Sequence, residues 1–236
     1  MILLNAISSS RRRAGAFDPL SLSPSLWFKD TGSNLGQWDD FSGNGYHVTQ
    51  ATVNAQPQIV TGLQNGRQVR RFDGTNNILQ RSTFPSGISN CSMFAVMKWK
   101  SGGNNEDCPV SIGSAGMTNS DRVFYRYLNG TTLGFETWAN GITSSSINLD
   151  INGAFHVFST IQLGAAITLR RDGVGSNYTL SSVPNATTAG FSIGGLIGST
   201  NYFSDVDIGE VLIYPTALSD TNRNAVETYL TNKWFT

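Results

Sequence analysis

Apolar residues at every second position, interrupted by Asn-Gly and Asp-Gly pairs, constrain the fold of this chain more than any other feature. The clearest case is RVFYRYLNGTTLGFETWANG, residues 122–141, where the apolar positions on either side of Asn129-Gly130 are Val123, Tyr125, Tyr127, Leu133 and Phe135. A period of two is that of a β-strand, and Asn-Gly readily forms the tight turn of a hairpin. The same pattern continues to Asp172-Gly173, so we predict a series of antiparallel hairpins.

Two segments depart from simple alternation. Residues 93–97, MFAVM, are apolar at every position, which is typical of a strand buried on both faces at the centre of a sandwich. The C-terminal segment has Ser219 as a helix N-cap, followed by apolar residues at helical spacing: Val226, Tyr229, Leu230 and Trp234. We therefore predict an all-β sandwich of two antiparallel sheets with one C-terminal α-helix.

The composition of the 236 residues narrows the function. Charged residues make up 14% of the chain, against roughly 25% in an average soluble domain. The formal net charge is zero, so we expect neither nucleic acid nor an anionic membrane as a partner. Cys91 and Cys108 are the only cysteines, and we expect two unpaired thiols.

Residues 1–24 lack sustained periodicity and contain Asp18-Pro19 and Ser23-Pro24, which favour extended geometry in the residues before them. Because the arginines follow the short apolar run instead of preceding it, we expect no export signal. We interpret residues 1–24 as an arm that docks onto a protein partner, and residues 25–236 as the folded domain. The candidate docking residues are Met1, Ile2, Leu3, Leu4, Arg11, Arg12 and Arg13.

Three stretches carry a resemblance to a known family. They are LWFKDTGSNLGQWDDFSGNGYHVTQATVNAQPQIV with its W-x-D-x-S-G-N-G core, CSMFAVMKW together with ITLRRDGV, and IGEVLIYPTALSDTNRNAVETYLTNKW. Taken in this order, they resemble the concanavalin A-like, laminin-G-like jelly-roll domains that recur in virion proteins of tailed bacteriophages and in bacterial surface proteins. The resemblance covers about residues 25–236 and implies a concanavalin A-like jelly-roll sandwich.

The resemblance also implies a function. We expect a non-enzymatic virion protein, tail-associated or decorating the head and assembled in the host cytoplasm. It would be present in multiple copies, dock onto other virion proteins through its arm, and display a module that binds host glycans. The alternatives are a secreted or surface carbohydrate-binding, lectin-like domain and a glycoside hydrolase.

A hydrolase would use the acids of DVDIGE, which are Asp205, Asp207 and Glu210. Glycoside hydrolases need two carboxyl groups that flank the same glycosidic bond. On a regular strand Asp205 and Asp207 share a face and Glu210 points the other way, so catalysis would require a bulge at Gly209. We therefore expect a structural role for these acids and no catalytic residues.

Candidate ligand sites are sparse. Sugar binding uses an aromatic platform beside amides, and the candidates are Trp138 with Asn140, and Asn201 with Tyr202 and Phe203. Asp40, Ser42 and Asn44 match the first half of a calcium loop, but its twelfth position, which should be Glu, is Ala51. We expect no cofactor, and calcium is the one metal to consider.

Overall fold

The computed structural model describes residues 16–84, 90–100, 108–113, 123–128, 132–138, 142–148, 153–180, 183, 189–198 and 201–236. For the three segments between residues 123 and 148, it describes the backbone alone.

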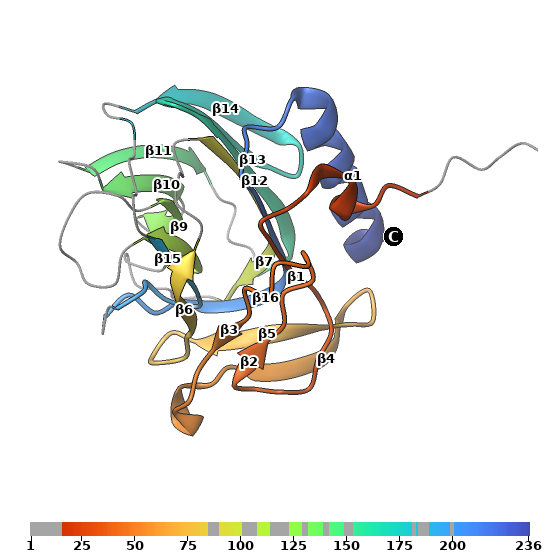
Figure 1. Ribbon diagram of the computed structural model, residues 1–236, viewed down its shortest axis with the longest axis vertical. Coiled ribbons are helices and arrows are strands. Elements are labelled where there is room, and N and C mark those ends of the chain that lie inside the picture. The colour runs from red at the N-terminus through yellow and green to blue at the C-terminus, as the bar shows by residue number, and fades with distance from the viewer. Residues whose placement is uncertain are drawn as a thin grey trace, which may run out of the picture.

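Two eight-stranded antiparallel sheets form the domain (Figure 1). Sheet A has the order β14-β13-β12-β7-β16-β5-β4, with β1 also paired to β16. Its strands are β1 (Leu26–Phe28), β4 (Gln58–Gln64), β5 (Arg67–Asp73), β7 (Asn90–Trp99), β12 (His156–Leu163), β13 (Ala166–Arg171), β14 (Val174–Thr179) and β16 (Asp205–Tyr214).

Sheet B has the order β11-β10-β9-β8-β15-β6-β3-β2. Its strands are β2 (Gln37–Trp38), β3 (Val48–Thr49), β6 (Leu79–Phe84), β8 (Val110–Gly113), β9 (Val123–Leu128), β10 (Thr132–Trp138), β11 (Ile142–Asn148) and β15 (Ala189–Ile193). The helix α1 (Asp220–Phe235) and the short 3-10 turns η1 (Pro19–Leu22) and η2 (Val53–Ala55) complete the described elements. The predicted fold class is confirmed.

Two layers of apolar side chains hold these elements together. The larger layer lies between the sheets and includes Phe28, Trp38, Phe72, Phe158 and Phe191. The second layer lies between the outer face of sheet A and α1, which covers that face in Figure 1. Strand β7 contributes alternate residues of MFAVM to both layers, as predicted for a central strand.

The turn and capping signals also have the predicted effect. Tyr125 pairs with Phe135 across β9 and β10, and Asp172 and Gly173 both take positive φ, at 50° and 77°, between β13 and β14. The Ser219 hydroxyl accepts a hydrogen bond from the backbone N–H of Asn222 at the start of α1.

Cys91 and Cys108 are not joined by a disulfide, as expected, and both are buried. Burial raises the pKa of the Cys91 thiol to about 12, so this group stays protonated at neutral pH.

The described part of the N-terminal segment belongs to the domain. Phe17 and Leu22 pack against the layer between sheet A and α1, Pro19 is buried, and the Tyr214 hydroxyl donates to the Pro19 carbonyl oxygen (3.4 Å). The folded domain therefore begins before residue 25, because η1 can bury apolar side chains that a free arm would expose to water. The candidate docking residues Met1–Leu4 and Arg11–Arg13 lie outside the described residues. Among the described helices, none is long and apolar enough to span a membrane.

The packing of α1 makes Trp234 a critical residue. Its side chain is 0% exposed, so Trp234→Ala should lower the free energy of unfolding by about 3–5 kcal/mol. Chemical denaturation monitored by circular dichroism measures this loss. The adjacent Phe235, 38% exposed, is the control, and equal losses for Trp234→Ala and Phe235→Ala would contradict the packing described here.

Candidate functional site

A β-bulge at Gly209 brings the acids of DVDIGE onto one face of β16. The register between β16 and β7 shifts between Ile208 and Glu210. Ile208 and Val211 both pack in the core between the sheets, so Asp207 and Glu210 both point to the α1 side of sheet A. The expectation that Glu210 points away from Asp207 is therefore wrong, because the bulge inserts one extra residue between them.

The packing of α1 explains why position 209 is glycine. A Cβ atom at Gly209 would lie 2.3 Å from the ring of Trp234, closer than any van der Waals contact. The indole of Trp234 occupies the space that a side chain at position 209 would need. The bulge and the helix are thus coupled through one residue.

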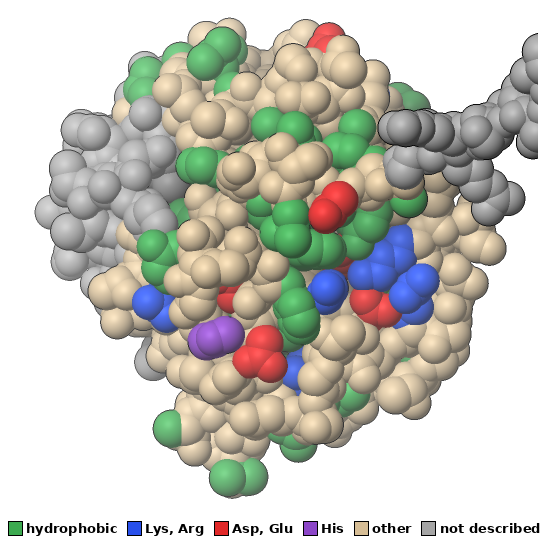
Figure 2. Space-filling view, turned by 45° about the vertical axis from the view of Figure 1, so that its right-hand side comes forward, with side chains coloured by type: hydrophobic (Ala, Val, Ile, Leu, Met, Phe, Trp, Pro, Cys, Tyr) green, Lys and Arg blue, Asp and Glu red, His purple; other side chains and the backbone are tan. Residues whose placement is uncertain are grey.

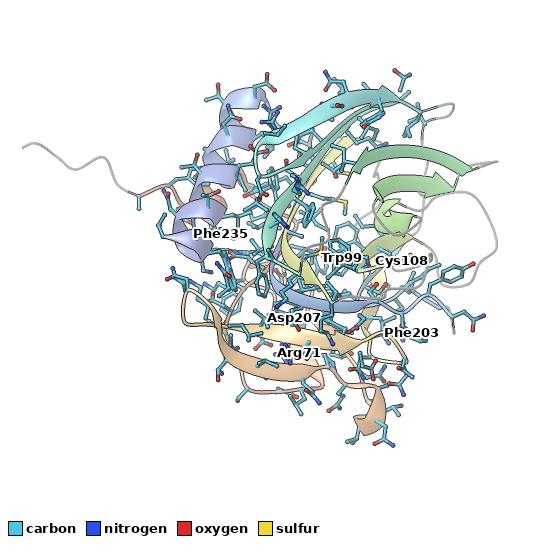
Figure 3. The ribbon with its side chains drawn as sticks, turned by 180° about the vertical axis from the view of Figure 1, so that it is seen from behind. Arg71, Trp99, Cys108, Phe203, Asp207 and Phe235 are labelled. Atoms are coloured by element: carbon cyan, nitrogen blue, oxygen red, sulfur yellow. The ribbon has the colours of Figure 1, made fainter. Side chains whose placement is uncertain are left out.

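Strong partners occupy the carboxylates themselves. The Asp207 side chain is 0% exposed and accepts hydrogen bonds from Arg71 Nε (2.7 Å) and Nη2 (2.9 Å). Figure 3 shows the two side chains side by side on neighbouring strands. Asp205, at the start of β16, forms an ion pair with Lys100. The first two acids therefore tie β16 to its neighbours.

Glu210 is as buried as Asp207, with a side chain that is 0% exposed. Its Oε1 accepts hydrogen bonds from Trp27 Nε1 (2.7 Å) and the Tyr229 hydroxyl (3.0 Å). Its Oε2 accepts from Trp234 Nε1 (2.8 Å) and pairs with Lys233 Nζ (2.8 Å). The carboxylate thus joins β1, β16 and α1, and its four donors occupy the positions that a substrate would need.

Lys233 extends this network to the surface. Its Nζ lies 2.5 Å from Asp30 Oδ1, and Arg67 Nη1 lies 2.7 Å from Asp30 Oδ2. Burial alone would raise the pKa of Asp30, but hydrogen bonds from Lys233 and Arg67 outweigh burial and lower it. On the face shown in Figure 2, charged side chains of both signs lie in small mixed groups.

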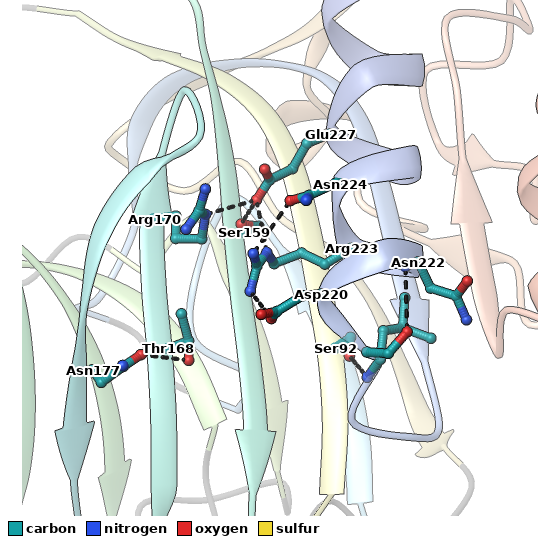
Figure 4. A network of polar contacts seen from close by, with 12 residues as sticks. Ser92, Ser159, Thr168, Arg170, Asn177, Asp220, Asn222, Arg223, Asn224 and Glu227 are labelled. Carbon is teal, nitrogen blue, oxygen red and sulfur yellow. Dashed lines mark hydrogen bonds and ion pairs between the residues drawn. The ribbon is translucent and has the colours of Figure 1, made fainter.

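A second polar network holds the other side of α1 to sheet A (Figure 4). Glu227 Oε1 accepts hydrogen bonds from the Ser159 hydroxyl (2.6 Å) and from Arg170 Nε (3.1 Å). Arg223 pairs with Asp220 one turn earlier in the helix (2.6 Å). The charged groups of this network therefore pair with one another or with Ser159, and Glu227 links α1 to β12 and β13.

The calcium candidates form a closed loop of hydrogen bonds. Asp40 Oδ1 accepts from the backbone N–H groups of Trp27 (3.0 Å) and Ser42 (2.9 Å), and Oδ2 accepts from the Ser42 hydroxyl (2.8 Å). The Asn44 side-chain amide donates to the Ser25 carbonyl (3.1 Å). Within the described residues, no group of three His, Cys, Asp or Glu side chains is arranged to hold a metal ion. These hydrogen bonds hold the loop of residues 40–44 against β1 and the residue before it.

The predicted sugar-binding residues are not brought together as one described site. Trp138 ends β10, where the backbone alone is described, and Asn140 lies outside the described residues. Asn201, Tyr202 and Phe203 belong to the segment between β15 and β16. The Leu196 N–H donates to the Tyr202 carbonyl oxygen (2.9 Å), and Tyr202 packs against Leu196 and Cys108. Tyr202 therefore has a packing role.

A groove of about 780 Å³ opens beside that segment, on the outer face of sheet B. Its lining residues are polar with few exceptions: Gln37, His47, Thr49, Gln50, Ala51, Gln80, Arg81, Ser82, Thr83, Ile197 and Gly198. Gln37 pairs with Thr49, and Thr49 pairs with Gln80, so these three side chains form a row across β2, β3 and β6. Among the described contacts, the side chains of Thr49, Gln80 and Ser82 have no hydrogen-bond partner.

The sequence contains a signal for this groove, although the groove was not predicted. Each polar residue of the row is adjacent to a fully buried apolar residue, since Gln37 precedes Trp38, and Gln80 follows Leu79. Alternation therefore predicts that these amides face outward. It does not predict that three short strands align them, because pairing between distant strands is not a local property.

Comparisons with known proteins identify the fold but no family. No family model and no curated protein matches the chain. The binding domain of Paraclostridial Mosquitocidal Protein 1 is similar in structure, with TM-score 0.67 and 14% identity over 90% of this chain and 53% of that one. Trypanosoma rangeli sialidase in complex with sialic acid gives 0.63 and 11%, over 89% and 33%. The botulinum neurotoxin serotype D binding domain gives 0.60 and 10%, over 88% and 51%.

This chain therefore spans about a third to a half of the length of these neighbours. At such low identity the likeness concerns the fold alone, a β-sandwich of antiparallel sheets, in agreement with the predicted jelly roll.

The burial of Glu210 leads to a stability prediction. Glu210→Gln replaces one acceptor oxygen by an NH₂ group that must face two donors, so we expect a loss of about 3–5 kcal/mol. Equilibrium urea denaturation measures it. Asp205→Asn is the matched control on the same strand, and its partly exposed ion pair should contribute less than about 1 kcal/mol. Equal effects of the two substitutions would rule out the anchoring role of Glu210.

The ion pairs of Asp30 lead to a pH prediction. Because its pKa is lower in the folded protein, Asp30 stabilises the fold above its unfolded pKa, about 3.9, and this contribution is lost as the pH falls further. Asp73 and Asp172 also have lowered pKa values and add to the trend. Stability should therefore fall steeply below about pH 4. In Asp30→Asn the fall should be shallower, and an unchanged pH profile of denaturation would contradict the assignment.

Proposed function

We propose that this chain is a non-enzymatic, lectin-like binding module that recognises glycans in the groove of sheet B. The observation that carries the proposal is the row of outward amide and hydroxyl side chains across β2, β3 and β6. A sugar hydroxyl both donates and accepts hydrogen bonds, and an amide such as that of Gln80 offers one group of each kind. The unpaired Thr49 and Ser82 hydroxyls do the same.

The enclosure of the acids supports a role without catalysis. A glycosidase needs two carboxyl groups that both reach the same bond. The side chains of Asp207 and Glu210 are 0% exposed, and each carboxylate is engaged by Arg71 or by the donors around Lys233. Moving either acid toward a sugar would break buried ion pairs.

The ligand class follows from the groove's chemistry. Among the described lining residues, Arg81 is the side chain that carries a positive charge, so acidic sugars are the first ligands to test. The structure of a sialidase neighbour in complex with sialic acid supports this choice. Because no aromatic side chain is among those lining residues, we expect weak binding at one site, with a dissociation constant of about 1 mM.

The opposite faces of the sandwich suit a displayed module. Residues 17–22 pack on the α1 side of sheet A, whereas the groove lies on the outer face of sheet B.

We propose that the chain is a virion protein of a tailed bacteriophage, docked to other virion proteins through its N-terminal segment. The resemblance of the W-x-D-x-S-G-N-G segment and the closing strand and helix supports this placement. Mass spectrometry of purified particles tests it, and presence of the chain only in the culture medium would favour a secreted lectin-like domain.

A glycan-binding experiment tests the groove. The double variant Thr49→Val/Gln80→Leu removes two hydrogen-bonding groups and should weaken binding of sialylated or uronate-containing oligosaccharides by about tenfold or more, as measured by saturation-transfer NMR. Thr61→Val/Gln58→Leu changes the same residue types on the exposed strand β4 and is the control. If both double variants bind like wild type, the glycans bind elsewhere, and if wild type binds no glycan of the panel, the proposal fails.

A further inference from the structure

The sandwich ends differently on its two sides. On one side the terminal strands are β4 in sheet A and β2 in sheet B, and on the other they are β14 and β11. A terminal strand presents unpaired backbone N–H and C=O groups that can pair with another chain. Proteins usually block such edges with short strands, bulges, charges or proline.

The β4 and β2 edges are blocked in these ways. Strand β2 has two residues. The pairing of β4 with β5 is interrupted between Val60 and Gln64, where Gly62 has a φ of 76°. The Gln64 side chain is also occupied, since it donates to the Trp234 carbonyl oxygen (3.0 Å). Neither edge offers a long, regular row of free amides.

The β14 and β11 edges have no such protection. Strand β14, VGSNYT, and strand β11, ITSSSIN, contain no charged residue and no proline. Their pairing with β13 and β10 is regular along the whole of each strand. Val174 at the start of β14 is 77% exposed, and residues 175–177 are exposed as well. Among the described strands, β14 pairs with β13 alone and β11 with β10 alone.

Turn geometry identifies the free amides of β14. Arg171 and Val174 flank the two-residue turn and form the hydrogen-bonded pair that closes such a hairpin. Alternation then directs the backbone N–H and C=O groups of Gly175, Asn177 and Thr179 away from β13. The short contact between Thr168 Oγ1 and Asn177 Oδ1 (2.8 Å, Figure 4) fits a non-hydrogen-bonded pair, in which side chains lie closer together.

We propose that β14 pairs antiparallel with β14 of a second copy of this chain, about a twofold axis that passes close to Asn177. A strand without charge meets its own copy without like charges opposite one another. Strand β11 lies close to both β13 and β14, so the same axis brings the β11 edges of the two copies toward each other and adds side chains of sheet B to the interface. The second layer matters because one strand pair falls below the roughly 1,200 Å² that stable interfaces bury.

Such a dimer would turn both grooves in the same direction. A twofold axis normal to the sheets keeps the outer face of sheet B on one side of both copies and the N-terminal segments on the other. Two weak sites on one surface then bind a glycan-coated surface with an avidity that exceeds either affinity. This consequence rests on the proposed function, whereas the self-association does not.

Sedimentation equilibrium of the full chain without glycan tests the proposal. Wild type should show a monomer–dimer equilibrium. Asn177→Lys and Asn177→Glu place like charges near the axis, so each alone should be monomeric, and an equimolar mixture of the two should restore dimers. Thr61→Lys on the β4 edge is the control and should associate like wild type.

Each contrary result overturns the proposal. A wild-type chain that stays monomeric up to about 1 mM, where even weak pairing is populated, excludes β14 self-association. If both Asn177 variants form dimers like wild type, a different surface mediates association. If each is monomeric and their mixture stays monomeric, the substitutions disturb the chain in another way, and the twofold pairing is wrong. Because mass is measured without sugar, these outcomes are distinguishable from failure of glycan binding.

Discussion

The carboxylate of Glu210 is the contact on which the rest of the structure depends. It accepts hydrogen bonds from Trp27 in β1 and Trp234 in α1, two residues near opposite ends of the chain. A buried charge is costly unless it is paired and hydrogen-bonded, and here an ammonium group, a hydroxyl and two indoles satisfy it. Only the complete arrangement of β1, β16 and α1 supplies all four donors, so the carboxylate favours this one packing over alternatives that leave it unpaired.

The contacts of Glu210 require the β-bulge in β16. Without the bulge, Glu210 would point into the core between the sheets, where Ile208 and Val211 now pack. The residue at the bulge must also leave space for the Trp234 indole, and only glycine does so. The motif DVDIGE therefore resembles a catalytic pattern for a structural reason, since acids on both sides of a bulge hold the adjacent strand and the helix in place.

The sequence predicts those parts of the fold that depend on local pattern. Alternation gives the strands, Asp172-Gly173 gives a hairpin, and Ser219 marks the start of α1, because each effect acts within a few residues. The partners of Glu210 could not be predicted, since Trp27 lies 183 positions away and no periodicity relates the two. The groove could not be predicted for the same reason, because Gln37 and Gln80 are brought together only by Thr49 on a third strand.

The division of the acids and amides between the two sheets has a consequence for function. Sheet A binds α1 on its outer face through Glu210, and Asp207 pairs with Arg71 on the neighbouring strand, so both buried acids already have partners. Sheet B has no α-helix on its outer face among the described elements, so the outward side chains of Thr49, Gln80 and Ser82 stay available to solvent. Exposed residues of β3 and β6 can therefore be substituted without disturbing the Glu210 contact. Under the proposed function, the residues that stabilise the fold are thus separate from those that would recognise a ligand, so recognition can change while the fold is kept.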